Sequence, residues 1–355
     1  MAANVPGLGN HLRLPKAMDT EREFLSGVVG SRHADGEAPW EEIVNLYVSL
    51  KTKPLLLLVG PPGTGKRAAA EKVARVLAGG DAVRYQSMLG HAWWAEGSSQ
   101  LGTFTQLQTR FNTLKIFSLM EEACQPDNGN QFFVGLLYRV SLAEVEGYFS
   151  RLASQITEGD VQQLPSGRNQ GPLPYPPNLR LIGTVDVPNY SWIDDPSLLS
   201  QTTIVHWDKD EKSCPSRDGL KRTLYPEAYF LHSSILSGTL AYWKLRSLPG
   251  WRPAHLRELL ELESMLIKNG IDLPTAQVTN EILIYLANAW SIEKEGLFSS
   301  MFDCNHTVAL DLAIAQSILP RIWKSINTSE KLQQQLMECL VGRFPRSLCL
   351  LEYWV

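Results

Sequence analysis

The chain has few of the features that mark a secreted, membrane or nucleic-acid-binding protein. Its five cysteines are scattered and none forms a C-x-x-C pair, which favours ordinary reduced thiols over a zinc site or disulfides. Apolar runs such as residues 54–59 are far too short to span a bilayer. Residues 1–10 lack the charged start and apolar stretch of a secretory signal. We therefore expect a cytoplasmic protein that does not associate with membranes.

A strong charge of one sign is also missing. The formal net charge is -4 and the isoelectric point is near 6.0, so the composition does not support a dedicated nucleic-acid-binding surface. The 355 residues, of which 44% are hydrophobic and 20% charged, are typical of a globular protein with a large core. This length suggests two domains, or one domain with a lid.

The clearest motif that is present is a phosphate-binding loop. The apolar run of residues 55–59 predicts a buried strand, and it leads into the motif Gly60, Pro61, Pro62, Gly63, Thr64, Gly65 and Lys66. Glycines in this pattern let backbone N–H groups point inward, while the next helix, expected at residues 68–77, presents its positive N-terminal end to the phosphates. The motif predicts ATP or GTP as a ligand.

The loop lacks the hydroxyl that normally follows its lysine. Ser or Thr at that position ligates the magnesium that bridges the terminal phosphates, whereas this chain has Arg67. We therefore expect Mg²⁺ binding to be weakened or lost. The fixed charge of Arg67 either takes the place of the metal or blocks the site, and the sequence leaves both open.

Strand and helix patterns alternate through the first 210 residues. Further strands are predicted at residues 82–86, 131–137, 178–185 and 202–207, and helices at 20–29, 39–50, 113–123 and 142–155. From residue 213 the pattern becomes mainly helical, with helices at 256–269, 276–289 and 308–326. This order predicts an α/β fold in which a parallel sheet lies between helices, followed by an all-helical domain. The expected division is an N-terminal extension at 1–38, a nucleotide-binding core at 39–210 and a helical lid at 211–355.

Several blocks in this order resemble the McrB-like branch of the AAA+ P-loop NTPases, the ring-forming motors of prokaryotic restriction and defence systems. The blocks that carry the resemblance are residues 53–66, 94–96 with 101–102, 141–150, 181–186 and 310–322. The resemblance implies an AAA+ core with a helical lid, and assembly with other AAA+ subunits into a homo- or hetero-oligomer. It also implies a nuclease or other effector as partner and a role in antiviral defence.

The chain departs from this family where the chemistry takes place. The family's catalytic Asp-Glu pair corresponds to Tyr138 and Arg139, which can neither ligate magnesium usefully nor accept a proton from water. The sensor Asn corresponds to Asp186, and Tyr190 and Gln201 stand where arginines that reach a neighbouring subunit are expected. The resemblance thus implies a pseudoenzyme with no catalytic residue of its own.

Other acidic and aromatic residues have ordinary explanations. Glu121 and Glu122 follow a segment of helical spacing, so we interpret them as a solvated helix face, and Asp194-Asp195 as a turn that ends at Pro196. Trp93 and Trp94 are better explained by an aromatic cluster than by stacking on bases. Residues 160–177 form either a surface loop or a loop that faces the pore of a ring, which leaves a nucleic-acid partner open.

Three functions remain open from the sequence. The first is a subunit that binds ATP or GTP without efficient hydrolysis, in which Arg67 and Arg139 converge as permanent countercharge. The second is a nucleotide-free scaffold whose Arg67 pairs with Asp186. The third is a working NTPase with unorthodox catalytic residues.

Overall fold

A parallel β-sheet forms the centre of the protein. The computed structural model describes residues 20–29, 38–90, 115–142, 145–158, 175–186, 195–208 and 227–354. Within these residues the sheet has five strands in the order β2-β3-β4-β1-β5, and every neighbouring pair is parallel. The strands are β1 (Leu55–Val59), β2 (Tyr85–Leu89), β3 (Phe133–Val140), β4 (Leu179–Val185) and β5 (Thr202–His206). The predicted α/β fold with a parallel sheet is confirmed.

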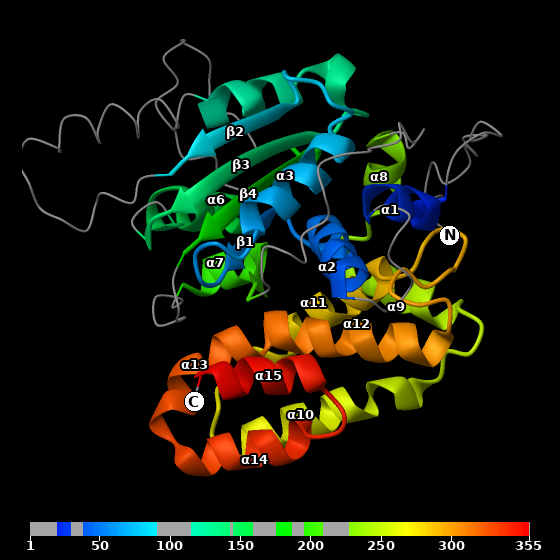
Figure 1. The fold of residues 1–355 in the computed structure, drawn as a ribbon. Coiled ribbons are helices and arrows are strands. Elements are labelled where there is room, and N and C mark those ends of the chain that lie inside the picture. The colour runs from blue at the N-terminus through cyan, green and yellow to red at the C-terminus, as the bar shows by residue number, and fades with distance from the viewer. Residues whose placement is uncertain are drawn as a thin grey trace, which may run out of the picture.

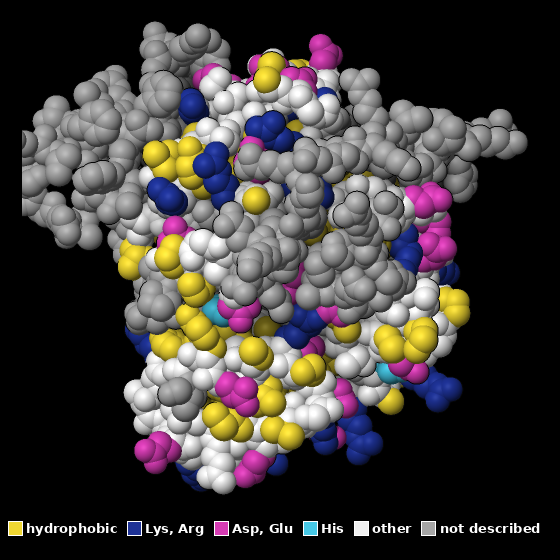
Figure 2. All heavy atoms as spheres, in the orientation of Figure 1, with side chains coloured by type: hydrophobic (Ala, Val, Ile, Leu, Met, Phe, Trp, Pro, Cys, Tyr) yellow, Lys and Arg dark blue, Asp and Glu magenta, His cyan; other side chains and the backbone are white. Residues whose placement is uncertain are grey.

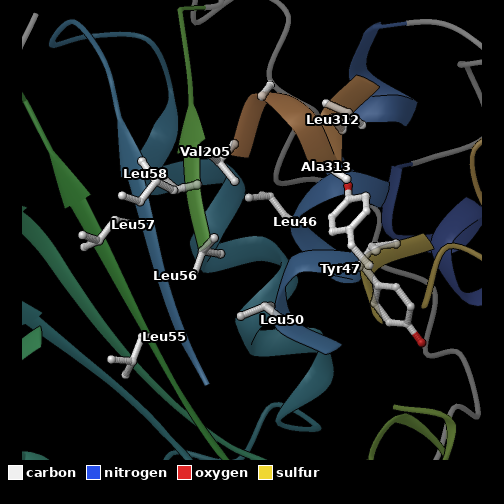
Figure 3. Packing of buried hydrophobic residues seen from close by; sticks show 14 of the residues in the cluster. Leu46, Tyr47, Leu50, Leu55, Leu56, Leu57, Leu58, Val205, Leu312 and Ala313 are labelled. Carbon is white, nitrogen blue, oxygen red and sulfur yellow. The ribbon is translucent and has the colours of Figure 1, made fainter. Parts of the chain in front are cut away.

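The middle of the sheet is apolar on both faces. Every residue of β1 and of β4 is buried, as expected for parallel strands that are covered by helices on both sides. Side chains alternate along a strand, so Leu55 and Leu57 lie on one side of β1 while Leu56 faces the helix α2 (Ala38–Thr52) (Figure 3). The core around β1 fixes the strand that leads into the phosphate loop.

The helices fall into two groups (Figure 1). The first surrounds the sheet and comprises α1 (Glu21–Val29), α2, α3 (Lys66–Leu77), the helix 115–123, the π-helix Val145–Ser150, α6 (Arg151–Glu158), α7 (Pro196–Gln201) and α8 (Glu227–Ser233). The second lies together beyond α2 and comprises α9 (Gly238–Arg246), α10 (Arg257–Lys268), α11 (Thr275–Asn288), α12 (Phe302–Ser317), α13 (Leu319–Thr328), α14 (Glu330–Leu340) and α15 (Pro345–Trp354). Helix α2 joins the groups, because it contacts β1 and α3 on one side and α11 on the other.

Several predicted elements differ in their bounds or continuity, and three of these differences have a clear place in the structure. Strand β2 begins at Tyr85, because the side chain of Asp81 accepts the N–H of Val83 at 2.8 Å and holds the preceding residues in a turn. The helix predicted at 308–326 is divided into α12 and α13, since Pro320 cannot continue a helix in its interior but fits the first turn of a new one. The helix predicted at 142–155 begins with a π-helical segment before α6.

A buried ion network joins the sheet to the second helical group. Lys53, just before β1, contacts Glu281 of α11 at 2.7 Å, and the same carboxylate contacts Arg321 of α13 at 2.7 Å. The Lys53 ammonium also donates to the carbonyl oxygens of Leu199, at 2.7 Å, and of Thr202. Burial lowers the pKa of Lys53 to about 8, although Glu281 opposes the shift.

The N-terminal helix α1 packs on α2 through a second set of buried polar contacts. Glu21 is fully buried and accepts hydrogen bonds from Lys51 at 2.6 Å and from the Tyr47 hydroxyl at 2.7 Å, both on α2. None of the helices among the described residues is both long and apolar enough to cross a membrane.

Candidate phosphate-binding site

The predicted phosphate loop, residues 60–66, connects β1 directly to α3. Its three glycines have φ values of 159° (Gly60), 78° (Gly63) and 77° (Gly65), which side chains of L-residues rarely adopt. The glycine spacing of the motif is therefore a backbone requirement in this chain. Helix α3 begins at the end of the loop without a side-chain cap, so its first-turn N–H groups are directed at the loop.

Lys66 is folded back onto the loop that contains it. The side chain is 4% exposed, and its ammonium donates to the carbonyl oxygens of Gly60, at 2.9 Å, and of Pro61. It also contacts the hydroxyl of Thr64 at 3.2 Å and a carboxylate oxygen of Asp186 at 2.9 Å. An ammonium has three protons to donate, so these four acceptors already saturate it.

Asp186 and Arg67 do not form the pair expected for an empty scaffold. Asp186 pairs with Lys66, whereas Arg67 lies on the aromatic ring of Tyr138, with its guanidinium carbon 3.8 Å from the ring centroid. Arg67 is also 3.8 Å from the carboxylate of Glu71, one turn along α3. The prediction of an Arg67–Asp186 pair is therefore wrong, because the lysine occupies the carboxylate and the aromatic ring holds the arginine.

Tyr138 and Arg139 lie near the carboxyl end of β3, where motif spacing placed them. The register of β3 against β4 is irregular between Leu137 and Val140, and Arg139 adopts a φ of 57° there. The backbone N–H of Arg139 donates to the hydroxyl of Thr184 at 3.0 Å, while its side chain is exposed. The strand order β3-β4-β1 brings these residues, Asp186 and the loop to one edge of the sheet.

The other predicted positions lie elsewhere. Gln201, at the end of α7, donates to the hydroxyl of Thr157 at 3.2 Å and precedes β5, so it lies at the edge opposite the loop. Asp195 caps α7 by accepting the N–H of Ser197 at 2.9 Å, which agrees with its interpretation as a turn residue. Glu121 and Glu122 lie on the helix 115–123. The predictions for Tyr190 and for the pair Trp93 and Trp94 lie outside the described residues. The loop predicted at 160–177 lies outside them except for residues 175–177.

Two residues at the end of β5 border the loop and were not identified from the sequence. His206 is the register partner of Val59, and burial lowers its pKa, with the charge of Lys66 acting in the same direction and Asp208 against it. Trp207 donates its indole N–H to the carbonyl oxygen of Thr64 at 2.8 Å. The sequence signal for both is only that they end the strand predicted at residues 202–207.

The site combines backbone donors with a locally balanced set of charges. Lys66 and Asp186 neutralise one another, while Arg67 and Arg139 add positive charge at the same edge. In the described ranges, no group of three or more His, Cys, Asp or Glu side chains is arranged to hold a metal ion. On the face shown in Figure 2, acidic and basic side chains are interspersed, in keeping with the small net charge.

At this edge of the sheet the N-terminus of α3 and two arginine side chains lie beside a phenol, and the Asp186 carboxylate is paired with Lys66. Comparison with known proteins adds no further assignment, since neither a family model nor a curated protein sequence matches the chain.

Proposed function

We propose that this chain is a degenerate AAA+ subunit of the McrB-like type, which binds ATP or GTP without efficient hydrolysis. It acts by assembling with other subunits in a prokaryotic defence or regulatory complex. The observation that carries the proposal is a contrast at one sheet edge. The glycines of the phosphate loop keep their special backbone conformations, whereas Tyr138 and Arg139 stand at the neighbouring strand end.

Retention of the loop favours nucleotide binding. Most of the favourable interactions with a bound phosphate come from backbone N–H groups, the helix N-terminus and the lysine. All three are present at Gly60–Lys66. A guanidinium next to the loop supplies charge that needs no metal. We therefore expect the nucleotide to bind without Mg²⁺.

Loss of catalysis follows from the residues around the loop. Hydrolysis requires a metal to stabilise the charge of the transferred phosphoryl group and a carboxylate to polarise water. Arg67 replaces the hydroxyl that would ligate the metal, and Tyr138 packs against it. Asp186 is engaged by Lys66, so it is held as a charge partner. A working NTPase with unorthodox residues would have to use this single carboxylate.

A specific observation favours a second candidate, a nucleotide-free scaffold. The Lys66–Asp186 contact of 2.9 Å places an internal anion on the lysine that would otherwise bind a phosphate. In a scaffold this ion pair would fill the role of the ligand permanently. In a nucleotide-binding subunit the phosphate displaces Asp186, at a modest cost because the carboxylate is 32% exposed and regains water.

Calorimetric titration with ATP and with GTP separates these candidates. We expect saturable binding that is unchanged by EDTA, loss of binding in Lys66→Ala, and no phosphate release above background. Lys324→Ala, on α13 away from the loop, is the matched control and should bind as the unaltered protein does. Absence of binding would favour the scaffold, and phosphate release that depends on Lys66 would favour the enzyme.

The assembly is tested separately. Native mass measurement of the purified chain, alone and with candidate AAA+ or effector subunits, should give a species larger than the 39.7 kDa monomer. A monomer under every condition would contradict action through assembly.

A further inference from the structure

Trp207 is held beside the phosphate loop by strand pairing. It directly follows β5, and its backbone N–H donates to the carbonyl oxygen of Val59 at 2.8 Å, which continues the parallel ladder to the last residue of β1. The side chain is 4% exposed. The position of Trp207 is therefore fixed by the sheet, independently of the loop.

The indole of Trp207 contacts the loop at one defined atom. Its N–H donates to the carbonyl oxygen of Thr64 at 2.8 Å. A trans peptide is planar, and its C=O and N–H point in opposite directions. By drawing the Thr64 carbonyl toward β5, the indole therefore turns the N–H of Gly65 the other way. The φ of 77° at Gly65 leaves the chain free to adopt this orientation.

The close approach of β5 also explains the first glycine of the loop. A Cβ atom on Gly60 would lie 1.9 Å from the carbonyl oxygen of Trp207, which no side chain can tolerate. The absence of a side chain at Gly60 is what allows Trp207 to reach the loop. Gly60 and Trp207 thus form one contact between β5 and the start of the loop.

We propose that Trp207 is a positioning residue of the phosphate loop, which orients the Thr64–Gly65 peptide so that its N–H faces the phosphate groups of a bound nucleotide. The ligand part of this inference rests on the proposed function. The effect on loop conformation does not, and it can be measured without ligand.

Trp40 provides a matched control within the same chain. It is also buried, and its indole N–H donates to backbone carbonyl oxygens, those of Leu297 and Phe298, both at 3.1 Å. These acceptors lie in the segment between α11 and α12. The same chemical change at Trp40 therefore removes a comparable hydrogen bond elsewhere in the fold.

The test is amide hydrogen exchange of peptides covering residues 60–66 in the full chain, measured by mass spectrometry without nucleotide. In Trp207→Phe we expect loop exchange to increase about tenfold, because the lost bond releases the Thr64 carbonyl. In Trp40→Phe the loop should exchange as in the unaltered protein. Unchanged loop exchange in Trp207→Phe, or an equal increase in both variants, overturns the proposal.

A second substitution serves if Trp207→Phe does not fold. Benzothienylalanine at position 207 keeps the size and shape of the indole and replaces only the N–H by sulfur, so the same increase is expected. Benzothienylalanine at position 40 is its control.

The effect of Trp207 on nucleotide binding is tested by calorimetric titration with ATP and with GTP. If the unaltered protein binds, the Kd should rise about tenfold in the position 207 variants and stay unchanged in the position 40 variants. An unchanged Kd despite faster loop exchange overturns the positioning role. If the unaltered protein binds neither nucleotide, the proposed function fails, and the exchange data still decide whether Trp207 orients the loop.

Discussion

Charged residues lie at both ends of the strands of the central sheet, and they differ in their exposure to solvent. We call the amino ends of the strands the amino edge and the carboxyl ends the carboxyl edge. At the amino edge, the network of Lys53, Glu281 and Arg321 is almost fully buried, with side chains 7–9% exposed. At the carboxyl edge, Lys66 is equally buried, but its neighbours Asp186 and Arg67 are 32% and 49% exposed. Buried charges must be paired in the fold because no water can solvate them, whereas partly exposed charges can exchange partners with a ligand. The charges at the amino edge therefore join parts of the fold, whereas Asp186 and Arg67 at the carboxyl edge remain accessible to solvent.

The amino edge also ties the sheet to the second helical group. The Leu199 carbonyl oxygen before β5 accepts from both Lys53 and Arg321, and the buried guanidinium of Arg180 donates to the carbonyl of Leu50 at 2.6 Å. Every one of these charges has its partners within the protein. At the carboxyl edge Lys66 also has its partners within the protein, but these are atoms of its own loop and the partly exposed carboxylate of Asp186.

Removal of the carboxylate that Lys53 and Arg321 share should have the largest effect on the free energy of unfolding. Glu281→Gln leaves Lys53 and Arg321 as two buried cations without an anion, and we expect a loss of about 3–5 kcal/mol in the free energy of unfolding. Urea denaturation measures it. Glu261→Gln, at an ion pair whose side chains are about half exposed, is the control and should cost under about 1 kcal/mol. A similar small loss at Glu281 would show that the network is not structural.

The buried ammonium of Lys53 should also make the stability of the protein depend on pH. The pKa of Lys53 is about 8 in the folded protein and near 10.5 when exposed, so between these pH values the unfolded state binds more protons. Stability from this group therefore rises as the pH rises through that window, by up to about 3 kcal/mol. It falls again as the pH is lowered.

Lys53→Met isolates this contribution. Denaturation curves at pH 7.5 and at pH 10 should show a smaller gain with pH in the variant than in the unaltered protein, because the titrating ammonium is gone while Glu281 keeps Arg321 as partner. Equal pH dependence in both proteins would mean that the burial of Lys53 does not shift its proton equilibrium.

The smallest effect on stability is expected at the carboxyl edge. Asp186→Asn should change the free energy of unfolding by less than about 1 kcal/mol, because the carboxylate is partly exposed. The same change removes the anion that competes with a phosphate for Lys66, so the Kd for ATP or GTP should fall by roughly tenfold. Calorimetry measures this.

Asp195→Asn provides the control for Asp186→Asn. Asp195 caps α7 away from the loop, and Asn is an equally good cap, so neither stability nor affinity should change. Weaker nucleotide binding in Asp186→Asn would contradict the account, since it would make the carboxylate part of the binding site.

The sequence predicted the elements with strong local signals. The buried apolar run of β1, the glycines after it and the helix α3 were all recognisable because hydrophobic pattern and turn chemistry are local properties. The start of β2 was missed by three residues, because the side chain of Asp81 stabilises a turn there that strand propensity does not register. The division between α12 and α13 follows from Pro320, which the apolar periodicity of the segment concealed.

Which residues lie near the loop was easier to predict than which contacts their side chains make. Tyr138, Arg139 and Asp186 were placed by motif spacing, and they do lie at the strand ends beside the loop. Which cation meets Asp186 depends on the direction in which the Lys66 side chain turns, and this is a three-dimensional property. The contact of Trp207 with Thr64 depends on the order of the strands, which places β5 next to β1.

The identity of the nucleotide that the protein holds after prolonged incubation decides directly between binding without hydrolysis and turnover. The protein is incubated with ATP or GTP, separated from free nucleotide, denatured, and its released nucleotide is identified by chromatography, with Lys66→Ala treated in parallel. We expect intact triphosphate bound to the unaltered protein and none bound to the variant. Recovery of diphosphate, or of no nucleotide from the unaltered protein, would contradict binding without hydrolysis.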